Sequence, residues 1–204
     1  MKEPFNILIA GVGGQGNLVC GRVLADASIE QGLRPVAGDT FGASRRGGSV
    51  LTHLRIGKMD WGPLIPQGEV DILLGLEPIE TLRAALDFAG ETTIVLMSLS
   101  AIPIADISSQ NKEYPSLESI VNALKKVCER VYILDTEIVL KEVGTKRVLN
   151  AFMLGALSVI ENSPLKQVSI RSSIVTMIGK DEDNIKAFDL GVHECKKILE
   201  SLKN

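Results

Sequence analysis

The hydrophobic positions of this chain follow two patterns, short continuous apolar runs and longer stretches with helical periodicity. Short apolar runs are typical of strands that are buried on both faces of a sheet. They predict strands over residues 6–10, 34–38, 49–56, 70–76, 93–97 and 131–135. The longer stretches predict helices over residues 15–31, 78–89, 117–127, 137–143, 147–161, 165–179 and 182–202.

This order of elements predicts the fold class. Alternation of strands and helices favours an α/β fold with an open, mostly parallel, Rossmann-like sheet, helices on both faces and a helical C-terminal region. The run Gly57-Lys58-Met59-Asp60 predicts the turn of a β-hairpin, the antiparallel element of the sheet. Residues 98–116 predict an irregular excursion. Since no repeat or linker divides the chain, residues 1–204 are predicted to form a single domain.

Composition narrows the class of protein. With 204 residues, of which 45% are hydrophobic and 23% charged, the chain is long enough to bury a full core. A net charge of −3 and scattered basic residues argue against a nucleic-acid partner. The uncharged stretch between Glu91 and Asp106 is shorter than the roughly 18–20 residues of a membrane span. No export signal follows Lys2, so we expect a cytoplasmic protein with no membrane partner.

The cysteines argue against two kinds of covalent site. Cys20, Cys128 and Cys195 are odd in number and far apart. They form neither a disulfide framework nor the clustered thiolates of an iron–sulfur site, and they suit a reducing compartment. We therefore predict no metal site on this chain.

A glycine-rich turn near the N-terminus is the main candidate binding element. It follows the first predicted strand and comprises Gly11, Gly13, Gly14, Gln15 and Gly16. Such turns let the backbone approach a phosphate or another anion at a helix N-terminus. The spacing also satisfies the dinucleotide fingerprint G-x-G-x-x-G, with Asp39 near the position of a ribose ligand. A tight strand-to-helix connection without a ligand, or a docking point for a partner loop, explains the glycines equally well.

A basic loop is the second candidate. It contains Ser44, Arg45, Arg46, Gly47, Gly48 and Ser49. The planar guanidinium group binds carboxylate or phosphate through paired hydrogen bonds, so an anionic substrate or cofactor fits this loop. The competing interpretation is that one arginine pairs with an internal acid or that both contact a neighbouring subunit.

Other polar residues give weaker signals, and no catalytic residue can be assigned. His53 has no serine or second histidine at a triad spacing and reads as a strand-face residue. Glu77 lies where open α/β sheets bind ligands, but it equally suits the N-terminus of a helix. Asn150 is either a partner contact or a solvated helix residue, and Trp61 either an interface anchor or a core residue.

Three motifs together resemble one family. The turn at 11–16, the loop at 44–49 and the run from Arg147 to Leu157 are similar to the gamma domain of the 2-oxoacid:ferredoxin oxidoreductases. The likeness extends from about Asn6 to about Leu199 and is greatest to the small beta subunit of the indolepyruvate type. One departure is Arg45, where the family pattern often has an uncharged residue before Arg-Gly-Gly-Ser, and it leaves the identity of the 2-oxoacid open.

The resemblance implies a function that the isolated chain cannot perform. It implies oxidative decarboxylation of a 2-oxoacid, with indolepyruvate or another arylpyruvate as the expected substrate and coenzyme A as co-substrate. Thiamine diphosphate, magnesium and iron–sulfur clusters are then expected on a larger partner subunit, which passes electrons to ferredoxin. The turn at 11–16 and the loop at 44–49 become the expected contacts for coenzyme A, and self-association is expected as well.

Two other functional classes stay open at this point. The fingerprint and Asp39 favour a stand-alone dinucleotide-binding dehydrogenase, although no acid–base pair accompanies them. The same donors would also serve a non-enzymatic anion-binding scaffold module. Stoichiometric nucleotide binding by the isolated chain would support the dehydrogenase. Ligand binding that persists without a large partner, together with no loss of oxidoreductase activity when the chain is deleted, would support the scaffold.

Overall fold

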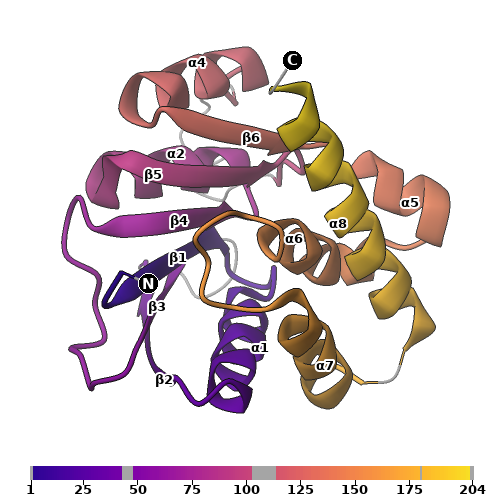
Figure 1. Ribbon diagram of the computed structural model, residues 1–204. Coiled ribbons are helices and arrows are strands. Elements are labelled where there is room, and N and C mark those ends of the chain that lie inside the picture. Colours follow the sequence, from indigo (N-terminus) through magenta and orange to yellow (C-terminus); the bar gives the residue numbers. More distant parts are fainter. Residues whose placement is uncertain (1, 43–47, 103–113, 180, 203–204) are drawn as a thin grey trace.

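The computed structural model describes residues 2–42, 48–102, 114–179 and 181–202. A six-stranded sheet with the order β2-β3-β1-β4-β5-β6 forms its centre (Figure 1). The strands are β1 (Phe5–Val12), β2 (Arg34–Phe41), β3 (Ser49–Gly57), β4 (Val70–Gly75), β5 (Ala89–Ser98) and β6 (Arg130–Leu134). Five of them run in one direction, and only β3 is antiparallel to its neighbours β1 and β2. The carboxyl ends of β1, β4, β5 and β6 therefore meet at one edge of the sheet.

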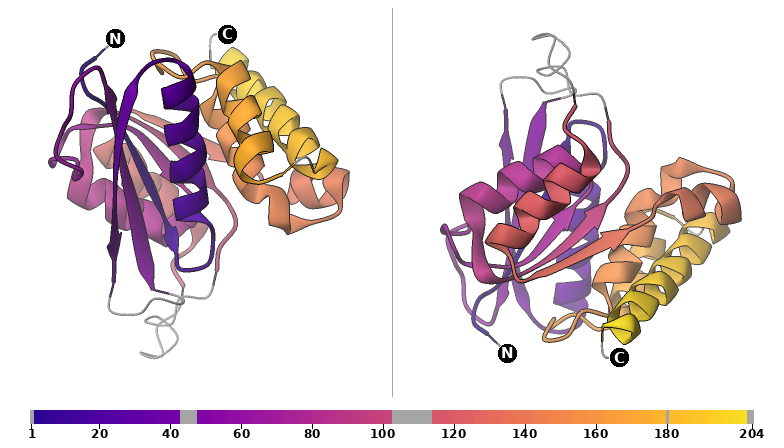
Figure 2. Two further views of the ribbon diagram at one scale, coloured as in Figure 1. Left: turned by 90° about the horizontal axis from the view of Figure 1, so that it is seen from below. Right: turned by 90° about the horizontal axis from the view of Figure 1, so that it is seen from above.

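Helices cover both faces of this sheet. Figure 2 shows α2 and α4 on one face and α1, α6, α7 and α8 on the other. The described helices are α1 (Asn17–Glu30), α2 (Pro78–Phe88), α4 (Leu117–Val127), α5 (Glu137–Val143), α6 (Leu149–Leu157), α7 (Gln167–Met177) and α8 (Glu182–Ser201), with a short 3-10 turn at Lys146–Val148. This arrangement confirms the predicted α/β fold with a mostly parallel sheet and a helical C-terminal region.

The continuous apolar runs are explained by a core on each side of the sheet. Along β1, Ile7 and Ile9 pack with α1, α6 and α8, whereas Leu8 and Ala10 pack with α2 and α4. Successive side chains of a strand point to opposite faces, so a strand covered on both sides needs apolar residues at every position. All eight residues of β1 are accordingly buried.

The predicted hairpin at Gly57–Asp60 is wrong. After β3 the chain does not return beside it; the next strand, β4, pairs in parallel with β1 on the opposite side. The antiparallel hairpin is instead β2–β3, whose two strands are connected by residues 42–48. Turn residues show where a chain can reverse direction, but the pairing partner is chosen by competition among all the strands of the sheet.

Five of the seven described helices differ from their predicted bounds, α2 and α8 by one residue and α7 (Gln167–Met177, predicted as 165–179) by two residues at each end. The predicted helix 15–31 begins at Asn17, because Gly16 has a left-handed backbone conformation with φ of 87°. The predicted helix 147–161 is shorter, since α6 ends at Leu157 and its first residues form the 3-10 turn. By contrast, α4 and α5 have the predicted bounds. Within the described part of the chain, no helix combines the length and the apolar character needed to cross a membrane.

Candidate functional site

The glycine turn lies at the carboxyl end of β1, where its glycines are required for steric reasons. Gly14 and Gly16 have φ values of 103° and 87°, a backbone conformation that residues with a side chain rarely adopt. A Cβ on Gly16 would also lie 2.1 Å from the Asn150 amide nitrogen, and one on Gly11 would lie 2.7 Å from Gln15 Oε1. Glycine therefore lets the turn pack closely against α6 and against its own side chains.

Gln15 holds this turn in place. Its Oε1 accepts a hydrogen bond from the Val12 amide at 2.8 Å, and its Nε2 donates to the Leu76 carbonyl at 3.0 Å. The side chain thus connects the carboxyl ends of β1 and β4. Both polar atoms of the Gln15 side chain are therefore used by hydrogen bonds to the backbone.

The end of the basic loop contacts the same turn. The Gly13 amide donates to the Gly48 carbonyl at 2.9 Å, and Ser49 pairs with Val12 at the start of β3. Ser44, Arg45, Arg46 and Gly47 lie outside the described residues. Among the described residues, the end of the basic loop at Gly48 and Ser49 therefore lies beside the glycine turn at one edge of the sheet.

A pocket of about 570 Å³ opens beside the glycine turn. Its walls come from Gly14, Gln15 and Gly16 after β1, Leu76 after β4, residues at the end of β5, and Arg147, Leu149, Asn150 and Met153 around the start of α6. In open α/β sheets, ligands bind at the carboxyl ends of the strands, and this pocket has that position. Its volume is in the range of small-molecule and cofactor sites.

Arg147 gives this pocket its positive charge, and sequence reasoning had not singled it out as a binding residue. Its side chain is exposed, and among the described residues no carboxylate lies within 4.0 Å of it. A guanidinium group without an internal partner can bind a phosphate or carboxylate. One feature of the sequence could have identified Arg147: it lies three residues before Asn150, and side chains at this spacing share one face of a helix.

The side chains of the weaker candidates make contacts within the folded chain. Asp39 accepts a hydrogen bond from the Thr52 hydroxyl at 2.6 Å. His53 is buried on β3, where its Nδ1 accepts from the Ile65 amide and burial lowers its pKa. Trp61 is only half-buried, and its ring packs against the guanidinium group of Arg55. These contacts are structural, and none of them assembles a catalytic acid–base pair.

Glu77 is a buried carboxyl group that caps α2. It accepts hydrogen bonds from the Glu80 amide at 2.9 Å and from the Tyr114 hydroxyl. Burial raises its pKa, and these hydrogen bonds only partly oppose the rise. The interpretation of Glu77 as a residue at the N-terminus of a helix is therefore confirmed.

The cysteines are poorly suited to bind a metal. Cys20, Cys128 and Cys195 are all buried. Burial raises the pKa of the Cys20 thiol to about 12 and that of Cys195 to about 11. Because metals bind the thiolate form, these groups do not fit an iron–sulfur cluster. Over the described residues, no three His, Cys, Asp or Glu side chains gather as a metal site either.

Fold and site together define a Rossmann-like α/β protein with a cationic ligand pocket at the carboxyl edge of its sheet. Residues 6–194 match the family model described as pyruvate ferredoxin/flavodoxin oxidoreductase. The chain belongs to this family of oxidoreductases.

Individual relatives agree in length as well as in sequence. The chain is 34% identical over 193 residues to the indolepyruvate oxidoreductase subunit IorB of Archaeoglobus fulgidus, a match that covers 94% of this chain and 95% of the relative. Among solved structures, it resembles a keto/oxoacid ferredoxin oxidoreductase gamma subunit from Geobacter sulfurreducens, with a TM-score of 0.69 and 20% identity over 95% and 99% of the two chains.

A larger protein contains the same fold. The chain superposes on the 2-oxoglutarate:ferredoxin oxidoreductase of Magnetococcus marinus with a TM-score of 0.69 and 21% identity. The match covers 97% of this chain but 32% of that one. The same fold thus occurs both as a separate subunit and as part of a longer polypeptide.

Proposed function

We propose that this chain is the small subunit of a 2-oxoacid:ferredoxin oxidoreductase that acts on indolepyruvate or a related arylpyruvate. The observation that carries the proposal is the end-to-end match to a relative named as an indolepyruvate oxidoreductase subunit. The separate gamma subunit among the solved structures supports the subunit role by its fold. The complex is proposed to work in the cytoplasm.

We propose that the cofactors are held by a partner subunit rather than by this chain. The buried, weakly acidic thiols suit neither an iron–sulfur cluster nor a redox disulfide. We therefore assign thiamine diphosphate, its magnesium ion and the iron–sulfur clusters to a larger subunit, through which electrons reach ferredoxin. The proposed role of this chain is to complete the active-site approach and to bind the acyl acceptor.

Coenzyme A is the ligand proposed for the carboxyl-edge pocket, where it would supply the thiol that accepts the acyl group. Its phosphates fit the free guanidinium group of Arg147, and its pantetheine arm fits the apolar walls at Leu149 and Met153. The turn at 11–16 and the loop at 44–49 are proposed to line the same approach. Gln15 contributes indirectly, since its hydrogen bonds hold the turn between β1 and β4.

Anaerobic purification of this chain from its native cells tests the subunit role. We expect a larger iron–sulfur protein to accompany the chain, and the complex to reduce ferredoxin with an arylpyruvate only when coenzyme A and thiamine diphosphate are present. A chain that emerges alone and binds a dinucleotide stoichiometrically would contradict the proposal and favour a dehydrogenase.

The substitution Arg147→Met tests the pocket in the assembled complex. Loss of one charged hydrogen-bonding group is expected to raise the KM for coenzyme A by about tenfold and to leave the KM for the 2-oxoacid unchanged. The matched control is Arg171→Met, which removes an exposed arginine of α7 that pairs with Asp189 of α8. An equal response of the two variants would remove Arg147 from the binding site.

A further inference from the structure

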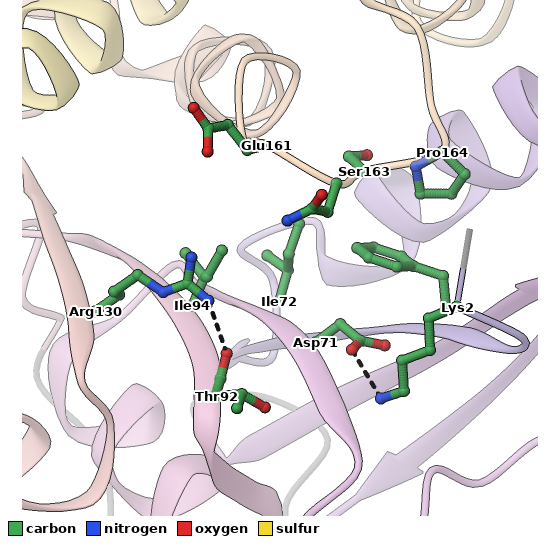
Figure 3. Close-up of a pocket in the computed structure, with 11 residues that line it drawn as sticks. Lys2, Asp71, Ile72, Thr92, Ile94, Arg130, Glu161, Ser163 and Pro164 are labelled. Carbon is green, nitrogen blue, oxygen red and sulfur yellow. Dashed lines mark hydrogen bonds and ion pairs between the residues drawn. The ribbon is translucent and has the colours of Figure 1, made fainter.

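A second cavity lies at the opposite, amino edge of the sheet (Figure 3). Its volume is about 550 Å³. Lys2, Asp71, Thr92 and Arg130 border it, and they lie just before β1 or near the amino ends of β4, β5 and β6. The segment between α6 and α7 forms the facing wall, which Figure 3 shows at Glu161, Ser163 and Pro164. This cavity is therefore separate from the carboxyl-edge pocket.

The floor of the cavity is apolar. Phe5, Ile72 and Ile94 line it, and each is at least nine-tenths buried. Apolar surface also continues past Arg130, because a smaller hollow of about 220 Å³ shares Ile94 and Arg130 and is walled by Ile160 and Leu199. A ligand that fills either space must bring an apolar body, since water gains few hydrogen bonds there.

Some of the charged side chains around this floor have an ionic partner, and others do not. Lys2 and Asp71 form an ion pair at 2.8 Å, and the second oxygen of Asp71 accepts from the Asn6 amide at 2.8 Å. This pair is internally neutral. Figure 3 shows both dashed contacts of the cavity, the Lys2–Asp71 pair and a hydrogen bond from Arg130 to the Thr92 carbonyl, which measures 3.3 Å.

Arg130 is the group that this surface leaves without an ionic partner. It is half-buried, and no carboxylate of the described residues lies within 4.0 Å of it. A guanidinium group carries five N–H donors, and within the described ranges Arg130 makes one hydrogen bond, to the Thr92 carbonyl. A partly desolvated cation with free donors beside an apolar floor favours an anion of single charge.

The facing wall supplies a neutral donor. Asn162 has a left-handed backbone conformation with φ of 66° and lines the cavity, and its side-chain amide has no hydrogen-bond partner among the described residues. An amide that lines the same cavity as an arginine can donate a hydrogen bond to the second oxygen of a carboxylate. A phosphate dianion fits less well than a single negative charge, because the carboxylates of Asp71 and Glu161 both border the cavity and the floor cannot hydrate the dianion.

We infer that this cavity is a second binding site, for a monocarboxylate with an apolar, ring-sized body. Its carboxylate binds Arg130 with help from Asn162, and its apolar body covers Phe5, Ile72 and Ile94. This assignment is independent of the proposed function, because it uses the other edge of the sheet and none of the residues assigned to coenzyme A.

Methyl NMR of the full 204-residue chain, labelled at the isoleucine methyl groups, tests the site with 3-phenylpropanoate as the probe. We expect saturable shifts at Ile72 and Ile94, and binding at least about tenfold weaker for the neutral analogue 3-phenylpropanamide. Arg130→Met should weaken binding of the acid to a similar extent. Absence of shifts at these two methyl groups, or tighter binding of inorganic phosphate than of the probe, would overturn the assignment.

Two variants serve as matched controls. Arg171→Met removes an exposed arginine elsewhere, and Arg147→Met removes the cation of the carboxyl-edge pocket. Both should bind 3-phenylpropanoate like the wild type, and a loss with Arg147→Met would place the probe in the other pocket. If Arg130→Met does not fold, the comparison of acid and amide on the wild-type chain decides the question, with equal affinities refuting the site.

Discussion

At the scale of single residues, polar side chains that the sequence offers as ligand contacts often form hydrogen bonds within the protein. Gln15 and Glu77 both stand at the carboxyl edge, where ligands bind in this class of fold. In the structure Gln15 connects two strand ends, and Glu77 caps a helix and holds Tyr114. Buried polar groups need hydrogen-bond partners, so these side chains satisfy backbone groups first.

Glu77 makes the free energy of unfolding fall as pH rises. Its pKa is raised in the folded chain, so the folded state binds this proton more tightly than the unfolded state does. The protonated group is therefore favourable at low pH, and this contribution is lost as pH rises through the raised pKa. Glu77→Gln stays neutral, so its stability relative to the wild type should increase between about pH 5 and about pH 8.

Urea unfolding at the two pH values measures this difference. The control is Glu91→Gln, which changes an exposed glutamate at the start of β5 and should follow the wild type at both values. A difference between Glu77→Gln and wild type that stays constant with pH, or that moves the other way, would show that burial does not govern this carboxyl group.

At the scale of elements, two glycines determine how closely α6 and α8 approach. A Cβ on Gly191 of α8 would lie 1.9 Å from the Phe152 carbonyl oxygen, and one on Gly155 of α6 would lie 2.1 Å from that of Phe188. The contacts are reciprocal, and each involves backbone atoms that cannot rotate away. The close approach buries Phe152 and Phe188 completely.

Gly191→Ala tests this packing. Alanine normally stabilises a helix by about 1 kcal/mol relative to glycine, whereas forced separation of two packed helices costs about 3 kcal/mol. We therefore expect a net destabilisation of about 2 kcal/mol in urea unfolding. Gly62→Ala, at a position where a Cβ meets nothing within 4 Å, should change stability by less than about 0.5 kcal/mol. A neutral or stabilising effect of Gly191→Ala would contradict the close approach.

The elements themselves were largely predictable from the sequence, because their signals are local. Helices 117–127 and 137–143 agree with the structure, and the apolar runs identified all six strands. Pairing was less predictable. The turn-like residues Gly57–Asp60 suggested a hairpin, but the strand after them pairs with β1 across the sheet, a choice that depends on all the strands together.

At the scale of the whole molecule, the parallel sheet separates two kinds of surface. The carboxyl edge gathers the glycine turn, the end of the basic loop and Arg147 from segments far apart in the chain. The amino edge gathers Arg130 and Asn162 over an apolar floor. The start of α6 lines the carboxyl-edge pocket and the connection from α6 to α7 lines the amino-edge cavity, so one region of the chain contributes to both; Figure 1 shows this region on one face of the sheet.

The sequence by itself determined the fold class, the glycine turn and the family, because periodicity, turn chemistry and motifs lie within short segments. It did not reveal that Arg147 faces the turn at Gly14–Gly16, or that Arg130 lies unpaired beside Phe5 and Ile94. Those groups are distant in the chain, and they meet only because the sheet order and the packing of α6 bring them together. Only the tertiary structure decides which charges are neutralised internally and which are left to bind a ligand.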